Sequence, residues 1–91
     1  MSNAPTRIEE AMRFACEAHK TQTRKSDGSP YVVHPLMCAH MLTRKGFEDD
    51  VIIAALLHDV LEDTGVAKET IRAQFGNHVL EIVEGVTEDK L

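Results

Sequence analysis

Residues 51–61 read VIIAALLHDVL, and this segment is the strongest indication of the fold class in the chain. Nine of its eleven residues are apolar. A helix that is apolar on all sides is buried rather than half-exposed, so the segment predicts a helix in the core of the protein.

The C-terminal end of this expected helix carries a histidine and three acids. His58 and Asp59 stand near the end of the apolar run, and Glu62 and Asp63 follow one turn later. At about 100° per residue, the four side chains fall within roughly 140° and share one face. A buried face with three carboxylates is unfavourable unless a cation neutralises it. The pattern predicts a divalent metal ion bound by His58 and Asp59; the alternative is a solvated His-Asp pair at a helix end.

A third ligand is expected from the polar segment 24–35, RKSDGSPYVVHP, which ends in a histidine before a proline. A residue before proline is pushed out of the helical region, and Pro35 suits the first position of a helix. We therefore expect His34 at a helix N-terminus, where its imidazole can point into a cleft. A His-Pro dipeptide alone is more typical of a turn, but together with His58 and Asp59 it becomes the natural third ligand.

The rest of the chain predicts helices joined by short connections. Thr6 and Glu9 form a capping-box pattern, and apolar residues recur at helical spacing after them. Gly46, Gly76 and Gly85 are expected to mark the ends of helices. The expected helices cover residues 6–20, 35–45, 48–62, 67–75 and 77–84, with a polar loop over 21–33. The predicted fold class is therefore all-α, a bundle-like domain of about five helices.

Length and composition indicate one small globular domain. The chain has 91 residues, of which 43% are hydrophobic and 27% charged, so we expect a single domain over 1–91 with a flexible tail at 1–5. No apolar run approaches the roughly 20 residues that span a membrane, and no signal peptide opens the chain. Cys16 and Cys38 lie in apolar helical patterns, which predicts two reduced core thiols and a cytoplasmic protein.

The net charge of −5 is distributed unevenly along the chain. Residues 1–45 hold seven Lys or Arg and four acids, whereas residues 46–91 hold three and eleven. A chain with this balance lacks the basic face of a DNA-binding protein. It suits a polyphosphate held between a basic wall and a metal on an acidic wall.

Several motifs follow one another in a specific order and spacing. They are AHKTQTRK at 18–25, PY at 30–31, HP at 34–35, AALLHDVLEDT at 54–64, FG at 75–76 and GVT at 85–87. Together they resemble the HD-superfamily alarmone hydrolases, which are the hydrolase domains of RelA/SpoT-type proteins and the small, single-domain SpoT homologues. Residues 85–90, GVTEDK, are especially similar to the small homologues. The resemblance extends over nearly the whole chain from Glu9 onward.

The resemblance implies a manganese-dependent hydrolase that removes the 3′-pyrophosphate from guanosine tetra- or pentaphosphate. His34, His58 and Asp59 match metal ligands of the family. The spacing of these residues alone fits manganese, iron or zinc, because all three accept mixed imidazole and carboxylate ligands.

The resemblance also implies roles for two pairs of neighbouring residues. Glu62 and Asp63 match the acidic pair that positions and activates the attacking water. Arg24 and Lys25 match the basic pair that lines the nucleotide pocket. A guanine nucleotide is therefore the expected partner, with no DNA and no membrane.

One element of the family pattern has no match in this sequence. The fourth metal ligand of the family is an aspartate on a later helix, in a Lys-Leu-Ala-Asp-Lys-like stretch, and no segment up to Leu91 matches it. The chain thus resembles the front part of such a domain. Two alternatives stay open: hydrolysis of another nucleotide, such as the 2′-phosphate of NADPH, and a non-catalytic nucleotide-binding or assembly module. If these 91 residues are the whole folded unit, an apolar face uncovered near the first and third helices predicts a homodimer.

Overall fold

The computed structural model of the protein describes residues 6–89, with side chains as far as Gly85. The tail predicted at residues 1–5 lies outside the described residues. The helices are α1 (Arg7–Ala18), α2 (Val33–Arg44), α3 (Asp49–Asp63), α4 (Lys68–Phe75) and α5 (Asn77–Asp89). Between residues 6 and 89 the only pairing of β type is an isolated bridge between Thr23 and Pro30, which narrows the loop before α2. The prediction of an all-α domain is confirmed.

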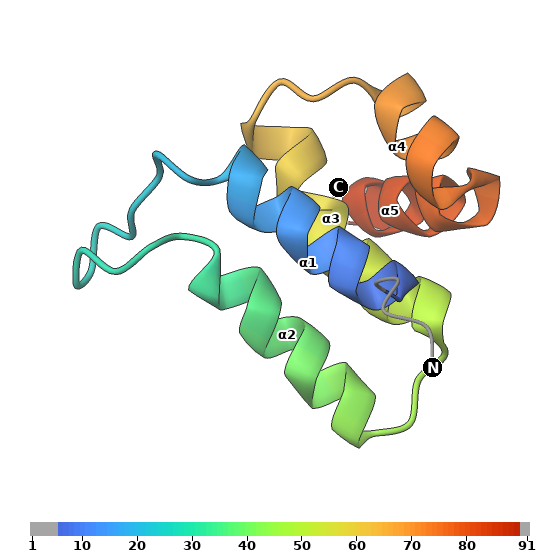
Figure 1. Ribbon diagram of the computed structural model, residues 1–91, viewed down its shortest axis with the longest axis horizontal. Helices are drawn as coiled ribbons and strands as arrows, with labels where there is room; N and C mark the ends of the chain where they lie inside the picture. Colours follow the sequence, from blue (N-terminus) through green and yellow to red (C-terminus); the bar gives the residue numbers. More distant parts are fainter. Residues whose placement is uncertain (1–5, 90–91) are drawn as a thin grey trace.

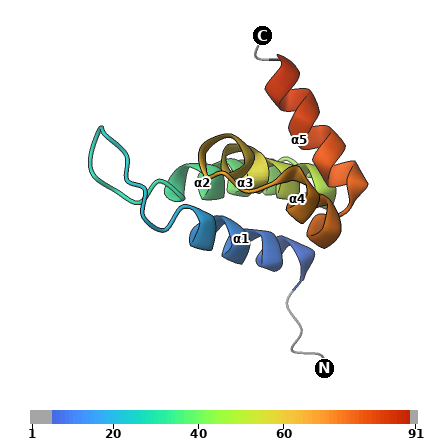
Figure 2. The ribbon, with the colours of Figure 1, turned by 90° about the horizontal axis from the view of Figure 1, so that it is seen from above.

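Helix α3 is the centre of the fold. It packs against α1, α2 and α5, while α4 packs on α5 (Figure 1). Figure 2 shows α1 and α5 on opposite sides of α3. The apolar run predicted as a buried helix supplies six of the buried core residues: Ile52, Ile53, Ala54, Leu56, Leu57 and Val60. Because neighbours cover α3 on several sides, the position of its last turn is fixed by the core.

The start of the first helix follows the capping-box prediction. The Thr6 side chain accepts a hydrogen bond of 3.0 Å from the backbone N–H of Glu9, and α1 begins at the next residue, Arg7. Such a cap satisfies one of the unpaired N–H groups at a helix N-terminus.

The second helix begins earlier than expected. We predicted that α2 starts at Pro35, but it starts at Val33, so His34 lies inside the first turn. A tight turn leads into it, with the N–H of Val33 bonded to the carbonyl of Pro30 and the N–H of His34 to that of Tyr31. Pro35 fits the third helical position because an N–H in the first turn has no partner within the helix.

The prediction that Gly85 ends the fifth helix is wrong. Helix α5 continues through this residue to Asp89. Gly85 does not have the positive φ of Gly76, which ends α4 with φ of 102°. A glycine inside a helix costs only about 1 kcal/mol relative to alanine, and the rest of the helix outweighs this cost.

The exposed apolar side chains differ from expectation. Cys16 is exposed and Cys38 is partly buried, so the prediction of two core thiols fails for Cys16. We expected an uncovered apolar face near α1 and α3, but the large exposed apolar residues of the described chain are Met37, Met41 and Phe47, on α2 and just after it. Within residues 6–89 no helix has the length and apolarity required to cross a membrane.

Candidate functional site

The last turns of α3 bring a histidine and two carboxylates together. His58 Nδ1 lies 3.2 Å from Asp59 Oδ1, and His58 Nε2 lies 3.3 Å from Glu62 Oε2. The side chains of His58 and Asp59 are each only 14% exposed, because the neighbouring residues of α3 hold this end of the helix in the core. Ligand atoms of the three residues all lie within 4.8 Å of one another. Three of the four side chains predicted to share a face are therefore grouped, and Asp63 is not part of the group.

Helix α2 contributes the second histidine. His34 Nε2 lies 3.9 Å from Asp59 Oδ2, although 24 residues separate His34 from His58 in the sequence. The position of His34 in the first turn of α2, which packs along α3, brings its imidazole to the carboxylate. The structure therefore brings the three predicted metal ligands to one place: Asp59 stands between the two histidines.

A largely apolar cavity opens beside these residues. Its volume is about 220 Å³, and it lies between α2, α3 and α5. His34, His58 and Asp59 form its polar end, and apolar side chains such as Leu42 and Ile82 form its walls. A concave site with apolar walls and a few convergent polar groups is typical of small-molecule binding.

Tyr31 approaches the same carboxylate from the loop before α2. Its hydroxyl donates a hydrogen bond of 3.0 Å to Asp59 Oδ2. Burial of the phenol raises the pKa of Tyr31 to about 12, and the hydrogen bond to Asp59 and the charges of Asp59, Asp63 and Glu62 act in the same direction. The tyrosine therefore stays protonated near neutral pH and acts as a donor to Asp59.

The chemistry of these residues fits a divalent cation. His58 Nε2 is buried and forms no hydrogen bond within the described residues, despite the nearby Glu62 oxygen. A buried polar nitrogen without a hydrogen bond is uncommon and calls for an explanation such as an ion. Asp59 and Glu62 supply the negative charge that a cation would neutralise, and imidazole with carboxylate is a donor set used for first-row divalent metals.

The two acidic residues predicted to be catalytic have different positions. Glu62 is exposed but belongs to the cluster with His58 and Asp59. Asp63 is the last residue of α3, and its backbone carbonyl accepts a hydrogen bond of 3.2 Å from Gln22 Nε2. Both acids are close enough to Tyr31 to raise the pKa of its hydroxyl. They therefore stand beside the expected metal ligands.

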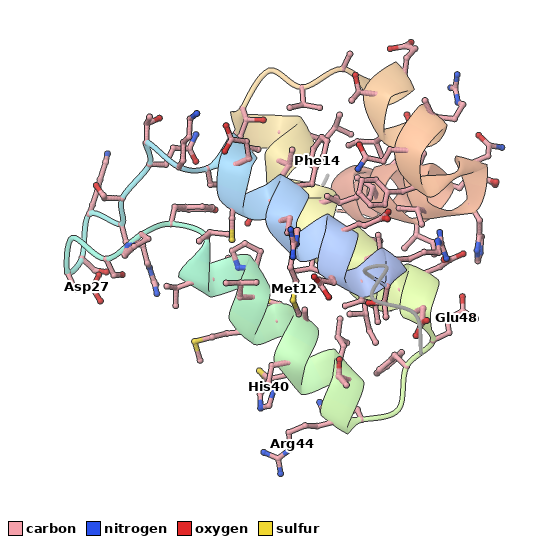
Figure 3. The ribbon with its side chains drawn as sticks, viewed as in Figure 1. Met12, Phe14, Asp27, His40, Arg44 and Glu48 are labelled. Atoms are coloured by element: carbon pink, nitrogen blue, oxygen red, sulfur yellow. The ribbon has the colours of Figure 1, made fainter. Side chains whose placement is uncertain are left out.

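The predicted basic pair lies on the loop that projects from the bundle (Figures 1 and 2). Arg24 and Lys25 are exposed, and Arg24 is held through its backbone by bonds to Ser29 and Gly28. Asp27 lies at the outer tip of this loop (Figure 3). No hydrogen bond or ion pair in the described part of the chain joins Arg24 or Lys25 to the acidic cluster. Of the seven predicted site residues, the structure thus brings four together, His34, His58, Asp59 and Glu62, and leaves the basic pair on the loop. Asp63 follows as the last residue of α3.

No role for Tyr31 was predicted from the sequence. His19, on which its ring packs, is buried, with 1% of its surface exposed. The partners of Tyr31 and Gln22 depend on how the loop folds back, which spacing along a helix cannot predict. The sequence did contain one indication of a role for these residues: Gln22 lies in the motif at 18–25, and Tyr31 lies in the motif at 30–31.

Comparisons with known proteins point to one family. Residues 11–90 match a family model described as HD domain. A guanosine-3′,5′-bis(diphosphate) 3′-pyrophosphohydrolase of Aquifex aeolicus is 48% identical over 90 residues, and one of Xenopus tropicalis is 47% identical over 93 residues. A solved structure, described as a metazoan ortholog of SpoT that hydrolyzes ppGpp, superposes with a TM-score of 0.83 and 31% identity.

These matches include most of this chain but only part of each relative. The matched region is 96% of this chain and 13% of the Aquifex protein, and 99% of this chain and 52% of the Xenopus protein. The solved structure is matched over 94% of this chain and 50% of its own. The chain therefore spans about half, or less, of the length of these relatives.

Proposed function

The chain belongs to the HD domain family, and we propose from this premise that it acts as a metal-dependent phosphohydrolase on guanosine tetra- or pentaphosphate. Water would cleave the ester that joins the pyrophosphate to the ribose 3′ position, with release of pyrophosphate and GDP or GTP. The observation that carries the proposal is the convergence of His34, His58 and Asp59 from two helices at the polar end of one cavity. The activity named for the Aquifex and Xenopus relatives supports the choice of substrate.

We propose His34, His58 and Asp59 as the ligands of a divalent cation, with Mn²⁺ as the physiological ion. When bound, such a cation supplies Lewis acidity toward a phosphoryl oxygen and a water. The protein contributes the fixed positions of the ligands: α3 holds His58 and Asp59 in the core, and α2 holds His34 against Asp59. Since the carboxylate of Asp59 lies between the histidines, its charge is shared between them.

Glu62 and Asp63 are proposed as the residues that orient the attacking water and accept its proton. They lie one turn beyond the metal ligands on the same end of α3. In such a pair one acid can act as the base while the other orients the water.

Arg24 and Lys25 are proposed to bind the phosphates of the nucleotide. Both are exposed on the loop that projects from the bundle, where a ligand can reach them. A guanidinium offers paired N–H donors to a phosphate, and an ammonium offers a compact charge. The partner is then a guanine nucleotide rather than DNA or a membrane, and a cytoplasmic location would give access to it.

Turnover by the purified 91-residue chain tests the proposal. Guanosine tetraphosphate and NADPH are supplied separately with Mn²⁺, and pyrophosphate or phosphate release is measured for the wild type and for Asp59→Asn. We expect Mn²⁺-dependent pyrophosphate release from the guanosine compound that Asp59→Asn abolishes. Phosphate release from NADPH, with no pyrophosphate release from guanosine tetraphosphate, would indicate NADPH as the substrate. Tight nucleotide binding without turnover would instead favour a nucleotide-binding role for these 91 residues.

A further inference from the structure

We propose that Tyr31 is a positioning residue of the metal centre, whose hydroxyl holds the Asp59 carboxylate in place while His19 and Gln22 fix Tyr31. This inference rests on the proposed function, because Asp59 must be a metal ligand for its position to matter. Tyr31 itself touches neither the substrate nor the cation in this account. It acts through the carboxylate oxygen to which it donates.

The two oxygens of the Asp59 carboxylate have different partners. Oδ2 accepts the Tyr31 hydroxyl at 3.0 Å, whereas Oδ1 lies 3.2 Å from His58 Nδ1. A carboxylate held at one oxygen loses rotation about its χ2 angle, which is otherwise a broad torsion. The hydroxyl therefore keeps Oδ1 and the remaining lone pair of Oδ2 directed toward the histidines.

Tyr31 is itself held by the end of α1. Its ring packs on the ring of His19, with centroids 5.0 Å apart, and its backbone N–H donates to the carbonyl of Gln22 at 2.9 Å. The turn is short because the N–H of Gln22 donates to the carbonyl of His19 at 2.9 Å. The end of α1 and the turn that follows it thus fix the phenol.

Gln22 connects His19 and Tyr31 to the C-terminal end of α3. Its Nε2 donates to the backbone carbonyl of Asp63 at 3.2 Å, so its Oε1 is free to accept from His19 Nδ1 at 2.7 Å. Since an amide oxygen can only accept, His19 must carry a hydrogen on Nδ1. The side chains of His19 and Gln22 therefore link α1 to the residue that follows Glu62. His19, Gln22 and Tyr31 therefore lie at the same end of the bundle as the proposed metal ligands.

We therefore expect Tyr31 and Gln22 to contribute to the affinity for the metal ion. Residues that hydrogen-bond a metal ligand typically change affinity by 10–100-fold when they are replaced. Tyr31→Phe keeps the ring that packs on His19 and removes only the donor to Asp59. Gln22→Met keeps the length of the side chain and removes its contacts to His19 and Asp63. Both changes should weaken Mn²⁺ binding. Gln22→Met should do so because it loosens the contacts that hold Tyr31 in place.

The experiment measures the dissociation constant of Mn²⁺ from the full chain by electron paramagnetic resonance of the free ion. The variants are Tyr31→Phe, Gln22→Met, their double variant and His58→Ala, with melting curves as a check on folding. Thr43→Val serves as the matched control, because it removes a hydroxyl that donates within α2 to Ala39. We expect a loss of about 10–100-fold for Tyr31→Phe, a smaller loss for Gln22→Met, and no change for Thr43→Val. The double variant should bind no more weakly than Tyr31→Phe alone.

The outcomes separate this inference from the proposed function. If the wild type binds Mn²⁺ and His58→Ala does not, the proposed metal centre is supported. If Tyr31→Phe then binds Mn²⁺ as tightly as the wild type does, the role of Tyr31 is refuted and the metal centre is not. If His58→Ala binds Mn²⁺ as the wild type does, the metal centre itself is refuted. Losses of Tyr31→Phe and Gln22→Met that simply add would show that Gln22 does not act through Tyr31, which overturns that part of the inference.

Discussion

Replacement of His58 by alanine should abolish the stabilisation of the fold by Mn²⁺. A cation shared by His34 on α2 and by His58 and Asp59 on α3 links two helices, so it binds the folded state and not the unfolded chain. Such a ligand at 100 times its dissociation constant stabilises by about 2.7 kcal/mol. For a domain of about this size each kcal/mol raises the melting temperature by roughly 4–8 °C, so the wild type should gain about 11–22 °C.

Differential scanning calorimetry with Mn²⁺ and with a chelator measures this gain. Each variant is compared with its own metal-free form, because loss of the mostly buried His58 side chain also lowers the free energy of unfolding by roughly 1–3 kcal/mol. His40→Ala is the matched control, since His40 points away from the bundle on the outer side of α2 (Figure 3). We expect the full gain in the wild type and in His40→Ala, and none in His58→Ala. An equal gain in His58→Ala would refute the assignment of the site.

Three further predictions concern Glu62 and Asp63, the fifth helix, and an ion pair in which His78 Nδ1 lies 2.7 Å from Asp50 Oδ2. Glu62→Ala and Asp63→Ala should each lower turnover by about 10²–10⁴-fold while Mn²⁺ content stays near that of the wild type; unchanged turnover in the double variant would contradict their role. The hydrogen bond of His78 to Asp50 raises the pKa of His78 above 6.5 and lowers that of Asp50 below 3.8. The stabilisation by His78 is therefore complete below pH 6.5 and is lost as the pH rises through its folded pKa, whereas that by Asp50 is lost as the pH falls through its own. His78→Gln should consequently lower the urea midpoint at about pH 5.5 and leave it unchanged at about pH 9, and an equal loss at both would exclude the ion pair as its cause. Gly85→Ala should raise the free energy of unfolding by about 0.5–1 kcal/mol, because the residue lies inside α5 with open space around it; a loss in urea denaturation would indicate that the helix ends there.

The central helix and its polar end were predictable from sequence for a simple physical reason. An apolar run of this length exceeds a typical buried strand and favours a helix that neighbours surround, and the helical period then fixes which side His58 and Asp59 share. His34 could be joined to them because a proline in the first turn of a helix limits where the histidine can stand.

Features that depend on contacts between elements were not predictable in the same way. Gly85 resembles a helix end in the sequence, but the packing of α5 against α3 outweighs the cost of one glycine. Tyr31 reaches Asp59 because the loop after α1 folds back through Gln22, and no periodic pattern encodes such a path. The exposure of Met37 follows from the face of α2 that meets α3, which spacing within α2 alone does not determine.

Anomalous diffraction from crystals of the chain soaked in Mn²⁺ would locate the metal ion. We expect one anomalous peak at the polar end of the cavity, with His34, His58 and Asp59 as ligands at about 2.0–2.3 Å. A fully occupied peak elsewhere on the protein, or no peak beside His58 at saturating Mn²⁺, would contradict it.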